Sequence, residues 1–366
     1  MIYCSRQVSV KIKVLSFWAT LAVIVIHSNS LESINDNAFA WWIGNAIAVL
    51  QYWAVPYFFV VSGFFFDRGY VLRDISAREF LRKKVFSLGL PYLLWGAVFG
   101  GAVLTPVLMY VNLRGGRPIC ENTFMDASSS VFAVDRLIGG FSGAPPNGAL
   151  WYIRMLLVIF LFAPIIKWLR KQFCVWVILC IGIFLIAFSS AINHGREMEM
   201  FVLYTIPVRM KLSGIGYFIL GMVISAYSLE NRSPRTMTVV PCVLIWFVGM
   251  LLAVFLRHKG IRILYPIELF ERFSPLLAII FLWTIPWEQT FISSDLISMR
   301  FWIYCMHHPI TSYVSAGLHA IVGHSLCAEF FNMAVGPPIC LLIVVLAGLM
   351  VRKVYPRMFG ILNGGR

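Results

Sequence analysis

The stretch that decides the fold is Lys11–Ser30, which reads KIKVLSFWATLAVIVIHSNS. Two lysines stand at its start, a mostly apolar run follows, and His27 stands near its end. As an α-helix, the run from Lys11 to His27 covers about 24 Å, most of a hydrocarbon core that is roughly 30 Å thick. The stretch therefore predicts a membrane helix with a basic end at one interface and an imidazole near the other.

The composition excludes a soluble protein. Of the 366 residues, 60% are hydrophobic and only 13% are charged, against about 25% charged residues in soluble domains. The net charge of +14 lies mostly in short loops between apolar runs, which is the bias of cytoplasmic loops rather than a nucleic-acid-binding surface. The eight cysteines show neither the spacing of a disulfide framework nor that of a metal site, so we expect no disulfide and no bound metal.

Apolar runs of roughly 17–25 residues predict an all-α fold, a polytopic transmembrane helix bundle of about ten spans in a single domain, residues 1–366. The eighth run is short and contains two prolines. The predicted spans are Lys11–Ser30, Trp41–Phe66, Val85–Val111, Ala149–Leu169, Phe173–Ala191, Leu212–Leu229, Val239–Leu256, Phe273–Trp287, Leu296–Val322 and Phe331–Val351.

The distribution of Lys and Arg predicts that both termini are cytoplasmic. Most of the 30 basic residues fall on the cytoplasmic side in this orientation, although Arg257, Lys259, Arg262 and Arg272 fall on the other. His27 then lies toward the outer side of the membrane.

Ionisable side chains within apolar spans are costly and are therefore candidate site residues. The first is His27, although a histidine that merely ends a helix at the interface is an alternative. Tyr304 and His307 lie three residues apart, on one face of a helix, and His308 follows directly. Arg154 stands one turn into the fourth span, after Trp151, where it either faces the protein interior or reaches water with its long side chain.

Two further motifs have both a functional and a plain interpretation. Ser62 and Gly63 form a small-residue notch that admits either a substrate or simply another helix. The basic cluster Arg82, Lys83 and Lys84 is suited to the phosphates of a nucleotide-bearing donor, or to lipid head groups.

The order of these motifs resembles the acyltransferase-3 family of bacterial membrane enzymes, over nearly the whole chain. Each motif is weak alone, but the set in this order is specific. One departure is Ser16, because many members carry an arginine eleven positions before the first-helix histidine. The matching pieces are His27, an FFxxSGF segment ending at Phe64, a basic cluster followed by Pro-Tyr-Leu-x-Trp (Arg82 to Trp95), an LWFL-like start of the fourth span at Leu150, Tyr217–Gly221, and Tyr304-x-x-His307.

The resemblance implies transfer of an acyl group, usually acetyl from acetyl-CoA, to a hydroxyl of a cell-surface glycan or lipid-linked sugar in the bacterial inner membrane. It maps the family's histidines on His27 and His307, and its late tyrosine on Tyr304. A buried, uncharged imidazole suits removal of the hydroxyl proton, and Arg154, Tyr304 or Ser62 are candidate donors to the oxyanion. The residues alone leave open which histidine is the base.

A second class of function fits the same residues. Intramembrane His and Arg side chains also serve proton and substrate pathways, so a multi-pass transporter or flippase for a glycan or small solute is the alternative.

For an acyltransferase, a cytoplasmic donor and an outward His27 imply that the donor thioester reaches through the helix bundle. Beyond the acyl donor we expect membrane lipid and the glycan acceptor as partners, and no nucleic acid.

Overall fold

The computed structural model describes residues 5–34, 36–98, 147–191, 198–203, 206–231, 236–259, 264–285 and 292–365. The chain divides into two compact units, each built from three segments that are distant in sequence. The first unit comprises Met1–Phe80, Leu161–Met198 and Lys211–Ile297, and the second comprises Leu81–Phe160, Glu199–Met210 and Ser298–Arg366. Residues 99–111 of the third predicted span, and residues 112–146 of the connection that follows it, lie outside the described residues.

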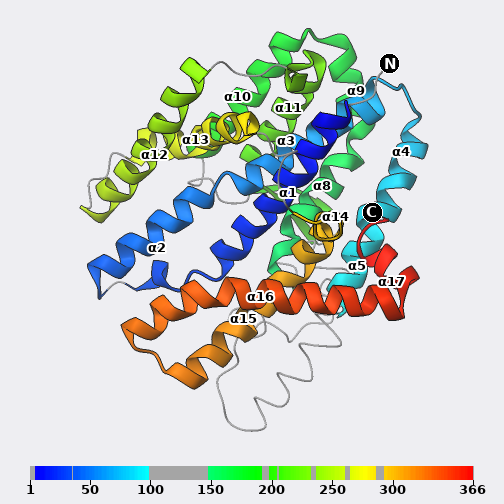
Figure 1. Ribbon diagram of the computed structural model, residues 1–366. Helices are drawn as coiled ribbons and strands as arrows, with labels where there is room; N and C mark the ends of the chain where they lie inside the picture. Colours follow the sequence, from blue (N-terminus) through cyan, green and yellow to red (C-terminus); the bar gives the residue numbers. More distant parts are fainter. Residues whose placement is uncertain are drawn as a thin grey trace. The chain divides into compact units, whose positions relative to one another are not determined.

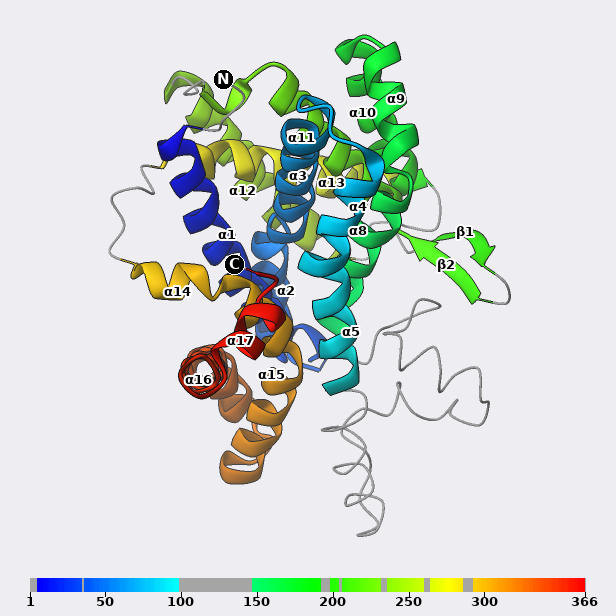
Figure 2. The same cartoon turned by 90° about the vertical axis from the view of Figure 1, so that its right-hand side faces the viewer.

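The described residues are helical, as predicted, apart from a two-stranded sheet that the sequence did not predict, β1 (Met198–Leu203) with β2 (Ile206–Met210) (Figure 2). The main helices of the first unit are α1 (Arg6–His27), α2 (Ala38–Gln51), α3 (Ala54–Phe66), α9 (Ala163–Gln172), α10 (Val175–Ala191), α11 (Leu212–Ala226), α12 (Thr236–His258) and α13 (Leu264–Thr284). Those of the second are α5 (Leu90–Ala97), α8 (Trp151–Leu161), α15 (Arg300–Val322), α16 (Leu326–Val354) and α17 (Pro356–Leu362). Short elements are η1 (Leu31–Ser33), the π-helices η2 (Asp67–Val71) and η3 (Val85–Gly89), α4 (Ala77–Lys84), η6 (Gly148–Leu150), η8 (Leu229–Asn231) and α14 (Ser294–Ser298).

Helix α1 begins five residues before the predicted span because Ser5 caps it. The Ser5 hydroxyl accepts a hydrogen bond from the Val8 amide at 3.2 Å, a cap that typically contributes about 0.5–2 kcal/mol. Inside the helix, the Ser16 hydroxyl donates to the Ile12 carbonyl at 2.6 Å. The Tyr57 hydroxyl of α3 donates to the same carbonyl. The polar groups of this buried face are thus paired within the protein, as burial away from water requires.

Helices α3 and α11 pack backbone to backbone through two glycines. A Cβ on Gly63 would lie 1.8 Å from the Phe218 carbonyl oxygen, and one on Gly221 would lie 1.9 Å from the Val60 carbonyl oxygen. Only glycine permits such an approach, as at small-residue contacts between membrane helices. The small-residue notch at Gly63 is therefore filled by a helix, and the family-like segment around Gly221 is what fills it.

The second unit has an indole-rich core between α5, α15 and α17. The Trp95 indole donates to the Leu362 carbonyl at 3.0 Å and lies edge-on to the ring of Trp302. Trp302 in turn donates from its indole to the Val344 carbonyl at 3.0 Å, and its amide donates to the Asn363 side chain. The tryptophan of the Pro-Tyr-Leu-x-Trp motif therefore has a structural role. In Figure 1, α15 and α16 form the orange and red hairpin of this unit.

Membrane-spanning character is clear, but a count of ten spans is not confirmed. Among the described residues, four helical segments are long and apolar enough to cross a membrane: Arg6–His27, Ala38–Val71, Val239–His258 and Leu326–Val354. A fifth is added if the pair α8 and α9, bent by 63°, is one broken span. The apolar window of α1 is 56% buried, whereas those of α12 and α16 are only 22% buried. The two less buried helices therefore present wide apolar faces, as lipid contact requires.

Several predicted spans differ from the observed helices, and Leu296–Val322 is divided at Met299 between α14 and α15. Trp41–Phe66 is interrupted at Tyr52 and Trp53, and Ala149–Leu169 bends at Phe162, with Pro164 in the first turn of α9. Proline in a first helical turn begins a new helix at no cost, because the amide it lacks has no partner there. The eighth helix, α13, begins nine residues earlier than predicted and runs without a break through Pro275.

Candidate functional site

The late Tyr-x-x-His motif lies in the buried first half of α15. The His307 side chain is fully buried, and its Nδ1 lies 2.7 Å from the Tyr304 carbonyl oxygen. A carbonyl can only accept, so Nδ1 carries the ring hydrogen and Nε2 of the uncharged ring carries the lone pair. This tautomer presents Nε2 as a proton acceptor. The Cys340 thiol donates to the His307 carbonyl from α16.

Two hydrogen bonds connect the residues directly before α8 to the Tyr304–His307 segment. The Tyr304 hydroxyl donates to the Ala149 carbonyl at 2.5 Å, and the Asn147 amide donates to the Cys305 carbonyl. Asn147 is fully buried, and its side-chain oxygen also accepts from the Ala149 amide and caps η6. No role was predicted for Asn147, which lies between the third and fourth predicted spans. Its position directly before an apolar helix, where asparagine is a preferred cap, was the available signal.

Arg154 and Trp151 stand on this same helix start. Arg154 is 1% exposed, so it faces the protein interior and does not reach water. Trp151 is half-buried. The Tyr152 ring lies edge-on to Tyr304, with ring centroids 6.0 Å apart. The second unit therefore brings Tyr304, His307 and the first turn of α8 together.

His27 and Ser62 belong to the first unit. His27 is the exposed last residue of α1, and Ser62 is half-buried on α3 next to the glycine that contacts α11. Ser16 is buried, and its hydroxyl donates to the Ile12 carbonyl of the same helix. Lys11 of α1 donates to the Trp283 carbonyl at 2.9 Å and lies over the Trp283 ring.

The basic cluster ends α4. Arg82 and Lys83 are exposed, while Lys84 is half-buried with its ammonium 5.0 Å from the centre of the Phe160 ring. This cation–π contact leaves the first two side chains as the more accessible cations of the cluster.

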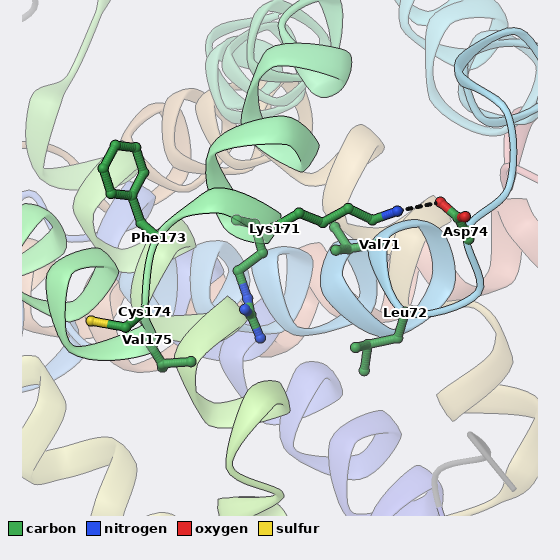
Figure 3. A pocket seen from close by; sticks show the side chains of 8 residues that line it. Val71, Leu72, Asp74, Lys171, Phe173, Cys174 and Val175 are labelled. Carbon is green, nitrogen blue, oxygen red and sulfur yellow. Dashed lines mark hydrogen bonds and ion pairs between the residues drawn. The ribbon is translucent and has the colours of Figure 1, made fainter.

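A pocket of about 560 Å³ opens beside the end of α9 in the first unit (Figure 3). Arg170 and Lys171 contribute the basic side chains of its wall, and the Lys171 ammonium lies 2.7 Å from the Asp74 carboxylate. Arg170 pairs with buried Asp67 at 3.2 Å. No role was predicted for these two cations, which lie between the fourth and fifth predicted spans. The lining residues are Val71, Leu72, Asp74, Arg170, Lys171, Phe173, Cys174 and Val175.

Asp74 lies in the loop after η2, outside the candidate spans. Hydrogen bonds from Lys167 and then Lys171 lower the pKa of its carboxyl group from 3.8 to about 2. Its backbone has a φ of 53°, a conformation that aspartate and asparagine tolerate better than most residues. The ion pairs of Asp74 with Lys167 and Lys171 therefore stabilise the loop, and aspartate suits its backbone conformation.

Comparison with known proteins identifies the family. The family described as "Acyltransferase domain" (Acyl_transf_3) matches residues 10–352. Neither a curated protein nor a solved structure matches the chain. The matched range contains the first-helix histidine, the paired glycines of α3 and α11 and the Tyr304–His307 motif. The chain belongs to the acyltransferase-3 family and is an acyltransferase.

Proposed function

We propose that this acyltransferase moves an acetyl group from acetyl-CoA to a hydroxyl of a cell-surface glycan or lipid-linked sugar. We place it in the bacterial inner membrane with both termini in the cytoplasm. Family membership supports the reaction class, and the resemblance in motif order supports the donor and the acceptor. The observation that carries the mechanism is the hydrogen bond between His307 Nδ1 and the Tyr304 carbonyl.

His307 is the proposed general base. Its Nδ1 is committed to a backbone acceptor, so Nε2 of the uncharged imidazole is the basic nitrogen. Complete burial keeps the ring uncharged in the resting enzyme, because an unpaired charge is costly away from water. Removal of a hydroxyl proton by such a group contributes typically about 10²–10⁴-fold to the rate.

The proposed reaction has two stages. Nε2 takes the proton of the acceptor hydroxyl as its oxygen attacks the thioester carbonyl carbon, and the carbonyl oxygen becomes an oxyanion. The C–S bond then breaks, and the leaving thiolate takes the proton from the imidazolium, which yields the ester and free coenzyme A. Arg154 is the proposed donor to the oxyanion, with Trp151 beside the substrate; the Tyr304 hydroxyl already donates to the Ala149 carbonyl, and Ser62 belongs to the first unit.

The donor's phosphates are proposed to bind Arg82 and Lys83, with Lys84 behind them. The first two are exposed on α4, and phosphate is bound strongly by paired basic side chains. Replacing both by alanine should raise KM for acetyl-CoA and leave kcat nearly unchanged, since they contact no reacting atom. Lys353→Ala, an exposed lysine of α16, is the matched control.

His27 is the alternative base, and one experiment decides between the two histidines. Thiol release from acetyl-CoA is measured with purified protein in detergent, with and without a glycan-lipid extract as acceptor. We expect His307→Gln to lower acceptor-dependent kcat by about 10²–10⁴-fold. The control is His258→Gln, an exposed residue at the end of α12.

Retention of near-normal kcat by His307→Gln would remove His307 from the mechanism. If His27→Gln then lost activity at normal protein levels, His27 would take the role of base. If acetyl-CoA were consumed in the presence of the acceptor without release of free thiol, the proposed thioester reaction itself would be contradicted.

A further inference from the structure

The connection between α15 and α16 gathers three side chains of metal-ligand type. His319 lies in the last turn of α15, His324 follows Gly323 in the connection, and Glu329 lies in the first turn of α16. Their ligand atoms all lie within 4.8 Å of one another. All three belong to the second unit, and the sequence analysis gave none of them a role.

The contacts place a lone pair of His319 Nε2 next to one of Glu329 Oε1. His319 Nε2 lies 3.0 Å from Glu329 Oε1. The Asn332 amide nitrogen lies 3.3 Å from the same Nε2 and donates to the Ser315 hydroxyl at 2.7 Å. With the amide in this orientation, one of its hydrogens goes to the Ser315 hydroxyl and the other points at Nε2, which then accepts. A carboxylate oxygen also only accepts, so a cation shared by Nε2 and Oε1 would satisfy both atoms.

A proton between His319 Nε2 and Glu329 Oε1 would pair these two atoms, but it would leave out the third base, His324. The His324 ring stacks on His319 with centroids 4.6 Å apart, and His324 is exposed and follows a glycine with a φ of 78°. Glu329 Oε2 is buried and accepts no hydrogen bond from the part of the chain that the structure describes. The 3.0 Å between Nε2 and Oε1 is also close to the roughly 3.3 Å between two ligands of a tetrahedral zinc ion.

We propose that His319, His324 and Glu329 bind one Zn²⁺ ion. Two imidazoles and one carboxylate are a usual zinc ligand set, whereas Mg²⁺ and Ca²⁺ prefer oxygen ligands only. A water molecule would occupy the fourth position. His319 lies about 18 Å along α15 from His307, so the ion is remote from the proposed base and clips the ends of the two helices together.

The test uses the full chain, purified in detergent with a tag that contains no histidine. After chelator treatment and removal of the chelator, zinc uptake is measured by equilibrium dialysis and elemental analysis, and the midpoint of thermal unfolding is measured with and without Zn²⁺. The variants are His324→Ala, whose side chain is exposed, and Glu329→Gln. The matched control is His258→Ala, an exposed histidine at another helix end.

The expected result is one zinc ion per chain and a midpoint that rises with Zn²⁺ for the parent and for His258→Ala. Both ligand variants should bind zinc at least tenfold more weakly and lose the rise, while eluting at the parent position in size-exclusion chromatography. Absence of stoichiometric zinc in the parent would overturn the proposal. So would equal zinc affinity in His324→Ala and the parent, because the ion would then lie elsewhere.

Discussion

The two glycines between α3 and α11 give the sharpest prediction. Real Cβ atoms essentially never come closer than 3.0 Å to another heavy atom outside their bonded neighbourhood, and an alanine at position 63 would place its Cβ 1.8 Å from the Phe218 carbonyl oxygen. The helices must therefore separate by at least about 1.2 Å in Gly63→Ala, and by nearly as much in Gly221→Ala. The contacted atom belongs to a backbone, so no side chain can rotate away.

The magnitude follows from this geometry. Overpacking costs typically about 1–3 kcal/mol, and a rigid backbone contact puts both variants near the upper value. At about 2–4 °C per kcal/mol for a domain of 150–250 residues, the unfolding midpoint should fall by roughly 6–12 °C. The control is Gly317→Ala on α15, where an added Cβ meets nothing within 4 Å. It should raise the midpoint or leave it unchanged, because alanine is favoured in helices by about 0.5–1 kcal/mol.

The assay is heating of detergent-solubilised protein followed by size-exclusion chromatography of the remaining monodisperse fraction. The double variant should lose less than the sum of the two single losses, because the first alanine already opens the gap that the second needs. A midpoint of Gly63→Ala within 1 °C of Gly317→Ala would refute the close packing of these helices.

Three other predictions concern separate parts of the chain. Asp74→Asn keeps the backbone conformation but loses the ionised carboxylate. Because the folded pKa is lowered to about 2, the parent's advantage in thermal midpoint should be full above pH 3.8 and disappear as pH falls toward 2. Asn147→Ala leaves the buried Cys305 carbonyl without its donor and should destabilise the protein by about 1–3 kcal/mol, measured by the same heating assay; a neutral effect would contradict this hydrogen bond. In a variant without native cysteines, Asp36→Cys should react with a membrane-impermeant maleimide in intact cells and Gln172→Cys only after lysis; the reverse would invert the proposed orientation.

The sequence was a good guide to membrane helices and a poor guide to where they break. Runs of apolar residues predicted α1, α10, α12 and α16, because lipid requires continuous hydrophobic surface and internally paired backbone. The break at Phe162 follows from Pro164, a local signal that hydropathy averages away. The bounds of α13 were wrong at its start, where charged residues hid a helix that continues beyond the apolar run.

The sequence indicated candidate residues for the site but not their contacts. The three-residue spacing of Tyr304 and His307 indicated a shared helix face, yet the hydrogen bond joins the imidazole to a backbone carbonyl. The partner of Cys305, Asn147, is 158 residues away in sequence, and no local pattern connects them. His319, His324 and Glu329 straddle a helix end, so neither helical periodicity nor a compact spacing marks them.

The widened turns η2 and η3 have an evolutionary consequence. A five-residue loop closed by an i→i+5 hydrogen bond is what a helix forms when it absorbs one inserted amino acid without losing its flanking turns. Relatives one residue shorter in Asp67–Val71 or Val85–Gly89 should run straight there. Alignments of the family should then place single-position gaps inside these two stretches and leave the helices on either side ungapped.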